Sequence, residues 1–142
     1  MPADTGDPTA IISQMTEDIA GIIRREAKTA EVARDGLARV IRRLAAVHEG
    51  HLAELLGEAG VMGGRPEDRG AMTSTVRAVP DIADEPGQSP HTDMGRVVSG
   101  EEWLLSRYDA AIAAAGSHAE IRNLLRRQRA ALEDYVATLR GG

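Results

Sequence analysis

The stretch TAEVARDGLARVIRRL, residues 29–44, decides the fold because it places the breaker Asp35-Gly36 between two helical patterns. On either side of the breaker, apolar residues recur at spacings of three and four, which is typical of an amphipathic helix. We therefore predict helices at residues 8–34 and 37–58, and so short a connection makes them an antiparallel hairpin. Their inward stripes are Ile12, Met15, Ile19, Ile22, Thr29 and Ala33, and then Leu37, Ile41, Leu44, His48, His51 and Leu55.

A second pair of helices is predicted in the other half of the chain. Apolar residues again recur at spacings of three and four within residues 92–115 and 118–140. Gly116 can end the first of these helices, and the sequence SHAE, with Ser117 and Glu120 as its capping residues, begins the next. The second pair is therefore also predicted to be a hairpin.

The two predicted hairpins are joined by residues 59–91, which are rich in glycine and proline and contain an acidic run. Such a composition predicts a long exposed crossover, in which AMTSTVRAV, residues 71–79, is a candidate short extra helix. A chain of 142 residues suits one domain with a single core. We predict one all-α domain over residues 1–142, a four-helix bundle with one long crossover, which is the ferritin-like arrangement.

Composition narrows the classes of function. The absence of cysteine excludes disulfides, thiolate metal sites and cysteine nucleophiles. The net charge of -5 gives no general reason to expect nucleic acid as a partner, and we interpret the arginine groups at residues 24–25, 42–43 and 122–129 as solvated helix faces. Neither a signal peptide nor a membrane-spanning run is recognisable. The expectation is a cytoplasmic protein that binds neither nucleic acid nor membranes.

Each predicted inward stripe carries polar residues near its middle. When positions are counted from the hairpin turns, these residues fall within about two helical turns of one another, at roughly 1.5 Å per residue. A buried carboxylate without a partner costs several kcal/mol, so the group requires mutual hydrogen bonds, a metal ion or exposure at a seam edge. The residues are Glu26 in the first helix, His48 and His51 in the second, Glu101 in the third and Gln128 in the fourth.

Imidazole and carboxylate together suit iron, manganese or zinc, and His48 and His51 at positions i and i+3 lie near enough on a helix to converge on one ion. We therefore take Glu26, His48, His51 and Glu101 as the candidate ligands. A polar patch satisfied by water or by hydrogen bonds stays open as the alternative. A rotation of the second helix by one residue keeps His48 inward and turns His51 away, so the inward position of His51 is conditional.

The ligand set of a catalytic di-iron bundle is incomplete in this sequence. Such a site takes one glutamate from each of two helices and a Glu-x-x-His pair from each of the other two. Here Ala45 stands three residues before His48, and the fourth helix offers Gln128 where a histidine is needed. Glu49, Glu54 and Glu58 are interpreted as solvated positions. The sequence thus favours a protein that is not an enzyme.

Two segments carry a resemblance to a known family. HLAELLGEAGVMGGRPED, residues 51–68, reads as the end of a helix and its exit loop, and SGEEWLLSRYDAAI, residues 99–112, contains Gly100-Glu101-Glu102 followed six residues later by Tyr108. In this pattern the chain resembles, over about residues 10–140, a ferritin-like family of uncharacterised bacterial four-helix-bundle proteins.

The resemblance implies a position for Glu101 and a class of function. The family pattern starts the third helix near Thr92 rather than at Ser99, which places Glu101 in mid-helix and facing inward. Relatives in the wider ferritin-like group bind, oxidise or store iron. The resemblance therefore implies a bundle of unknown physiological role that binds one metal ion, with iron the first choice. Self-association is expected separately, because Trp103 falls on a flank of the third helix, where an aromatic side chain is a candidate for a contact between bundles. The alternative is a non-enzymatic oligomerisation or interaction bundle with a relic polar core.

Overall fold

The computed structural model describes residues 7–61 and 90–141 and forms four helices there, with no strand in these ranges. The all-α prediction is thus confirmed. The candidate short helix at residues 71–79 and most of the crossover lie outside the described residues. The helices are α1 (Pro8–Val32), α2 (Asp35–Val61), α4 (Pro90–Ala115) and α5 (Ala119–Gly141).

The break between α1 and α2 lies two residues before the predicted position. Ala33 takes an extended conformation, with φ -79° and ψ 156°, and its N–H still donates to the carbonyl of Thr29. Asp35 and Gly36 then form the first turn of α2 instead of separating the helices. A carboxylate in the first turn is favoured by the partial positive charge of a helix N-terminus, which explains why Asp35 begins a helix there. The prediction that this pair acts as the breaker was therefore wrong.

Capping residues and a glycine explain where other helices begin and end. The carboxylate of Asp7 caps α1 by accepting a hydrogen bond from the N–H of Thr9 at 3.1 Å, and Pro8 occupies the first turn, where no N–H is needed. Gly116 ends α4 with a φ of 52°, a left-handed conformation that glycine adopts without steric cost. α2 extends to Val61 and α4 begins at Pro90, so both enter the predicted crossover by a few residues.

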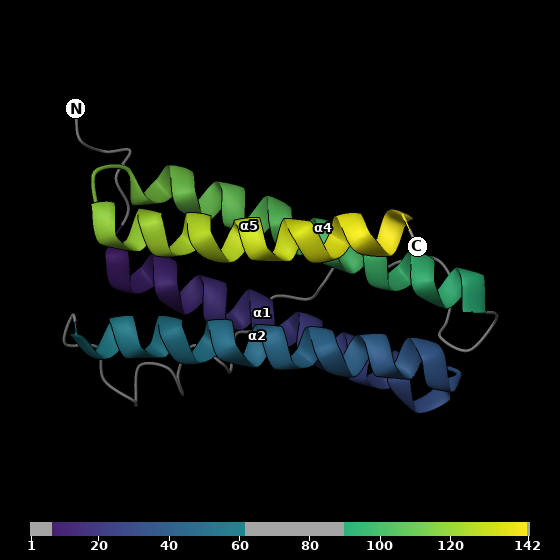
Figure 1. The fold of residues 1–142 in the computed structure, drawn as a ribbon. Helices are drawn as coiled ribbons and strands as arrows, with labels where there is room; N and C mark the ends of the chain where they lie inside the picture. Colours follow the sequence, from purple (N-terminus) through teal and green to yellow (C-terminus); the bar gives the residue numbers. More distant parts are fainter. Residues whose placement is uncertain (1–6, 62–89, 142) are drawn as a thin grey trace.

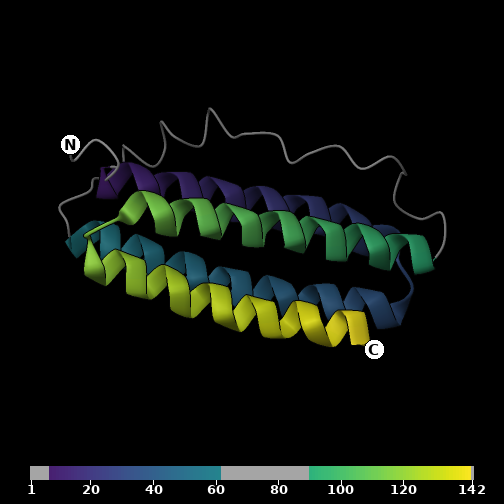
Figure 2. The same cartoon turned by 90° about the horizontal axis from the view of Figure 1, so that it is seen from above.

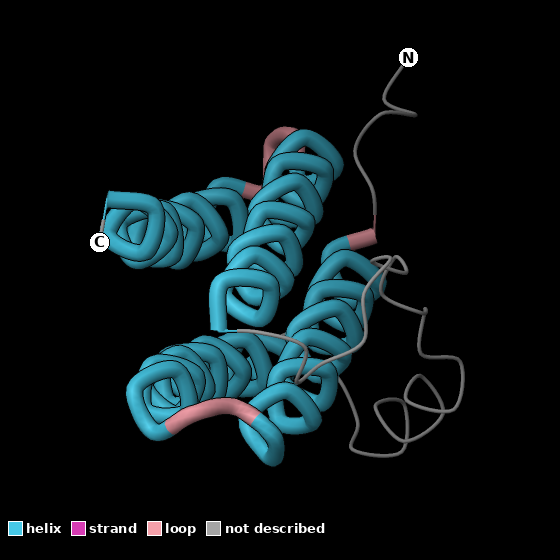
Figure 3. The backbone as a smooth tube through the Cα atoms, turned by 90° about the vertical axis from the view of Figure 1, so that its right-hand side faces the viewer, coloured by secondary structure: helices cyan, strands magenta, loops and turns pink. Residues whose placement is uncertain are grey.

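The helices pack around one core. α1 and α2 lie side by side, as do α4 and α5, and α1 also packs against α4 (Figures 1 and 2). An end-on view shows the four helices around a common centre (Figure 3). Each helix contributes fully buried apolar side chains to that centre, and those with no exposed area include Ile19, Ile22, Leu44, Leu55, Leu104 and Leu125. None of the described helices is long and apolar enough to cross a membrane.

Candidate metal centre

Three of the four predicted ligands meet in the middle of the bundle. Glu26 comes from α1, His48 from α2 and Glu101 from α4, and each is at most 3% exposed. Each of the three residues offers one ligand atom, and these atoms all lie within 4.8 Å of one another. The helical stripes explain this position, because each residue continues a run of core side chains at spacings of three and four. The structure therefore assembles one buried polar group from three distant parts of the sequence.

One hydrogen bond within this group joins the histidine to a carboxylate. His48 Nε2 lies 2.8 Å from Glu101 Oε2, with both side chains completely buried. A carboxylate only accepts hydrogen bonds, so the histidine N–H donates. Both carboxylate oxygens of Glu26, Oε1 of Glu101 and Nδ1 of His48 find no hydrogen-bond partner among the described residues. A buried polar atom that is left unpaired costs about 1–3 kcal/mol, so four of them together require a compensating ligand or proton.

The two carboxyl groups respond to burial in opposite directions. Burial raises the pKa of Glu26 well above its usual value, and the adjacent carboxylate of Glu101 adds to this effect. Burial acts on Glu101 in the same sense, but the interactions with Glu26 and His48 outweigh it and bring the pKa of Glu101 below its usual value. Without a metal ion, the two shifts thus favour a proton on Glu26 and a negative charge on Glu101.

The donor set fits a divalent transition-metal ion. Carboxylate oxygens and imidazole nitrogens bind iron, manganese and zinc at about 2.0–2.2 Å. Two ligand atoms on one such ion lie about 3–3.5 Å apart, so separations of up to 4.8 Å need to shorten by no more than about 1.8 Å. An ion here would also satisfy the unpaired oxygens of Glu26. Three protein ligands leave further coordination positions open.

His51 does not belong to this group of three. It lies one turn beyond His48, is half-buried, and its Nδ1 has no hydrogen-bond partner among the described residues. Burial, and next the nearby His48, lower the pKa of His51 below its usual value, so the ring is neutral at neutral pH. α2 is therefore rotated so that His48 points into the core while His51 lies at its edge.

α5 contributes no ligand to the group of three, and Gln128 instead forms hydrogen bonds to other residues. It is buried, accepts a hydrogen bond from the hydroxyl of Tyr108 at 2.9 Å, and donates to the carbonyl of His51 at 3.1 Å and to Glu54 at 3.0 Å. The sequence placed Gln128 on an inward stripe but gave no sign that it pairs with Tyr108. Glu54, interpreted from the sequence as only solvated, has an exposed side chain that also takes part in this network.

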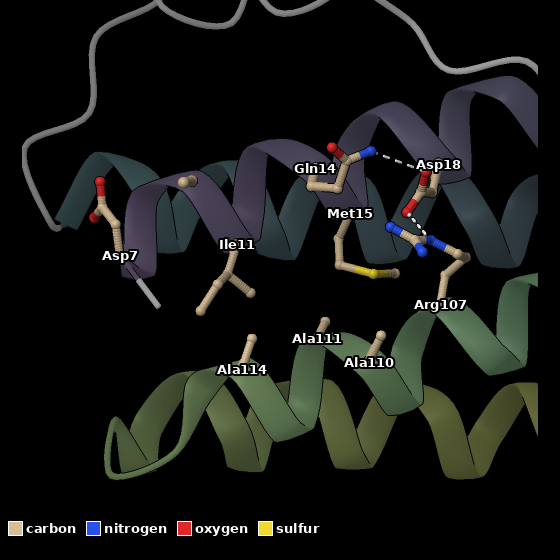
Figure 4. A pocket seen from close by; sticks show the side chains of 10 residues that line it. Asp7, Ile11, Gln14, Met15, Asp18, Arg107, Ala110, Ala111 and Ala114 are labelled. Carbon is tan, nitrogen blue, oxygen red and sulfur yellow. Dashed lines mark hydrogen bonds and ion pairs between the residues drawn. The ribbon is translucent and has the colours of Figure 1, made fainter. Parts of the chain in front are cut away.

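Asp18 is another buried carboxylate, which the sequence did not reveal, and both of its oxygens have partners. Asp18 is 2% exposed and binds Arg107 of α4 at 3.0 Å and Gln14 at 3.1 Å. Both contacts lie at one end of a cavity of about 300 Å³ between α1 and α4, whose lining is otherwise mostly alanine with Ile11 and Met15 (Figure 4). The cavity contains none of the three candidate ligands. Both oxygens of Asp18 thus have hydrogen-bond partners, unlike those of Glu26.

The chain matches no protein-family model, and no curated protein is similar to it in sequence.

Proposed function

We propose that this protein is a ferritin-like bundle of two antiparallel hairpins that binds one divalent metal ion through Glu26, His48 and Glu101. The observation that carries the proposal is the pair of buried Glu26 oxygens without a hydrogen-bond partner, close to two further side chains, His48 and Glu101, of types that bind metals. Iron is the first candidate because the resemblance to ferritin-like proteins suggests it, and manganese and zinc suit the same donors.

Each of the three side chains would contribute differently to metal binding. Glu101 brings a negative charge that persists in the buried site, while Glu26 gives up its proton when an ion binds, so that binding releases protons. His48 supplies a nitrogen donor and already lies in contact with Glu101. When bound, the ion would supply a Lewis acid with open coordination positions in a site closed to bulk water. No catalytic base lies in this group beyond the ligands themselves, so we propose binding rather than catalysis.

Elemental analysis and calorimetric titration test the proposal. Protein purified without a chelating tag and then given Fe²⁺ under anaerobic conditions, Mn²⁺ or Zn²⁺ should hold about one equivalent, and Glu26→Gln and Glu101→Gln should each lose it. His118→Ala is the matched control because His118 lies at the start of α5, outside the group of three. Wild-type protein that holds none of these ions would refute the proposal.

The alternative function is a non-enzymatic interaction bundle whose polar core gives specificity to the packing. The 2.8 Å hydrogen bond between His48 and Glu101 favours this alternative, because it satisfies two of the buried atoms without an ion. Elemental analysis together with analytical ultracentrifugation separates the two functions. The interaction bundle predicts no bound ion and a self-association that is the same in chelator and in metal, whereas the first proposal predicts about one ion per chain.

A further inference from the structure

We propose that His51 and Glu54 form an outer metal site on α2, through which ions reach the buried Glu26, His48 and Glu101. This inference rests on the proposed function and assigns a role to two residues that the buried centre does not use. The outer site would take the same class of ligand, a divalent transition-metal ion, from solvent.

Helical geometry places His48, His51 and Glu54 on a path from the core to the surface. The three residues follow one another at intervals of three, and each step of three residues turns about 60° around the helix and rises about 4.5 Å. Exposure changes accordingly, since His48 is completely buried, His51 is half-buried and the side chain of Glu54 is 39% exposed. Side chains of types that bind metals thus follow one another at intervals of about one helical turn from solvent to the buried centre.

Both outer residues have acceptor positions that no hydrogen bond within the described residues uses. Nδ1 of His51 has no hydrogen-bond partner among the described residues, although it is shielded from solvent. Each carboxylate oxygen of Glu54 accepts one hydrogen bond, from Gln128 at 3.0 Å and from Arg127 at 2.8 Å. A carboxylate offers about four acceptor positions, so two remain for an ion. These hydrogen bonds lower the pKa of Glu54, which is consistent with an ionised carboxylate at neutral pH.

Contacts from α5 hold this part of α2 in place and oppose a cation at the same time. Gln128 donates to both the His51 carbonyl and Glu54, so it fixes the turn of α2 that carries both outer residues. Arg127 competes with an incoming ion for Glu54, but its side chain is 64% exposed and a solvated ion pair of this kind is worth no more than about 1 kcal/mol. The structure therefore predicts opposite effects on metal uptake when Glu54 or Arg127 loses its charge.

Stopped-flow mixing with Co²⁺ tests the outer site, with the fluorescence of the single tryptophan, Trp103, as the reporter of binding. A residue that lies on the entry path but outside the final site changes association and dissociation rates by the same factor, so the equilibrium affinity stays constant. Glu54→Gln should slow both rates by about threefold or more, and Arg127→Gln should accelerate association. His51→Leu, which keeps an apolar side chain of similar size, should slow both rates as well.

Glu49→Gln is the matched control, since Glu49 is exposed on the same helix next to His48 but does not lie on the path from His48 to Glu54. It removes the same charge and should leave the rates within error of wild type. Equal association rates in Glu54→Gln, Glu49→Gln and wild type would overturn the outer site while leaving the buried centre intact. A loss of affinity without a change in association rate would also overturn it. Failure of wild-type protein to bind Co²⁺, Fe²⁺ or Zn²⁺ at all refutes the proposed function instead.

Discussion

The substitution Glu26→Gln gives the most direct test of the buried centre, because it removes one ionisable group and preserves its shape. Glu26 is 3% exposed and its two oxygens are unpaired, while burial and Glu101 raise its pKa well above the usual value. In the unfolded chain a glutamate has a pKa of about 4.3. Between that value and the higher folded pKa, the folded protein carries a proton that the unfolded chain has lost.

The sign of the pH dependence follows from this difference. Where the folded state binds more protons than the unfolded state, the free energy of unfolding falls as pH rises, by about 1.4 kcal/mol per pH unit. The contribution of Glu26 is fully present below the unfolded pKa and is lost as pH rises through the folded pKa. Glu26→Gln lacks this slope, so metal-free protein with the substitution should become more stable than wild type as pH rises above about 4.3. For a chain of this size, 1.4 kcal/mol corresponds to a Tm difference of roughly 5 °C.

Urea and thermal unfolding followed by circular dichroism, with EDTA present, measure this difference between pH 4.5 and pH 7.5. Glu31→Gln is the control on the same helix, because Glu31 is exposed. Added metal at 100 times its Kd should shift the difference at neutral pH by about 2.7 kcal/mol in favour of wild type, since the variant binds none. A stability difference between Glu26→Gln and wild type that stays constant with pH would refute the assignment of the buried proton to Glu26.

Three further predictions concern the contacts around the centre. Tyr108→Phe removes the donor to the buried Gln128 oxygen and should lower the free energy of unfolding by about 1–3 kcal/mol in urea titrations, whereas an unchanged midpoint would show that this hydrogen bond contributes nothing. Gly116→Ala forces a side chain into a left-handed conformation, with a φ of 52°, and should cost about 1–2 kcal/mol in the same assay; a gain in stability would contradict the strain. Arg107→Ala leaves the buried carboxylate of Asp18 without its cation and should lower the free energy of unfolding by about 1–3 kcal/mol. Adding Asp18→Asn to the same chain should restore part of this stability. A double variant less stable than Arg107→Ala alone would contradict the reasoning.

Periodicity predicted the burial of the candidate ligands, and the structure agrees for three of them. Glu26, His48 and Glu101 each continue an apolar stripe, and all three are buried. His48 faced inward under either rotation of its helix, which is why its position could be predicted. His51 could not be assigned, because a change of one residue in rotation moves it between core and surface, and the structure leaves it at the core edge. The sequence also placed the α1–α2 break two residues too late, since a breaker pair can equally begin a helix.

The sequence by itself determined four amphipathic helices, their approximate bounds and the presence of acids and histidines on inward stripes, because helical periodicity is a local property that repeats every few residues. Only the tertiary structure decided that Glu26, His48 and Glu101 meet. The same holds for the contact of Asp18 with Arg107, 89 residues away, and for the hydrogen bonds that join Gln128 to Tyr108 and Glu54 rather than to the buried centre. These pairings depend on the relative height and rotation of helices far apart in the chain. Side-chain packing across the whole bundle sets both quantities, and no short stretch of sequence encodes them.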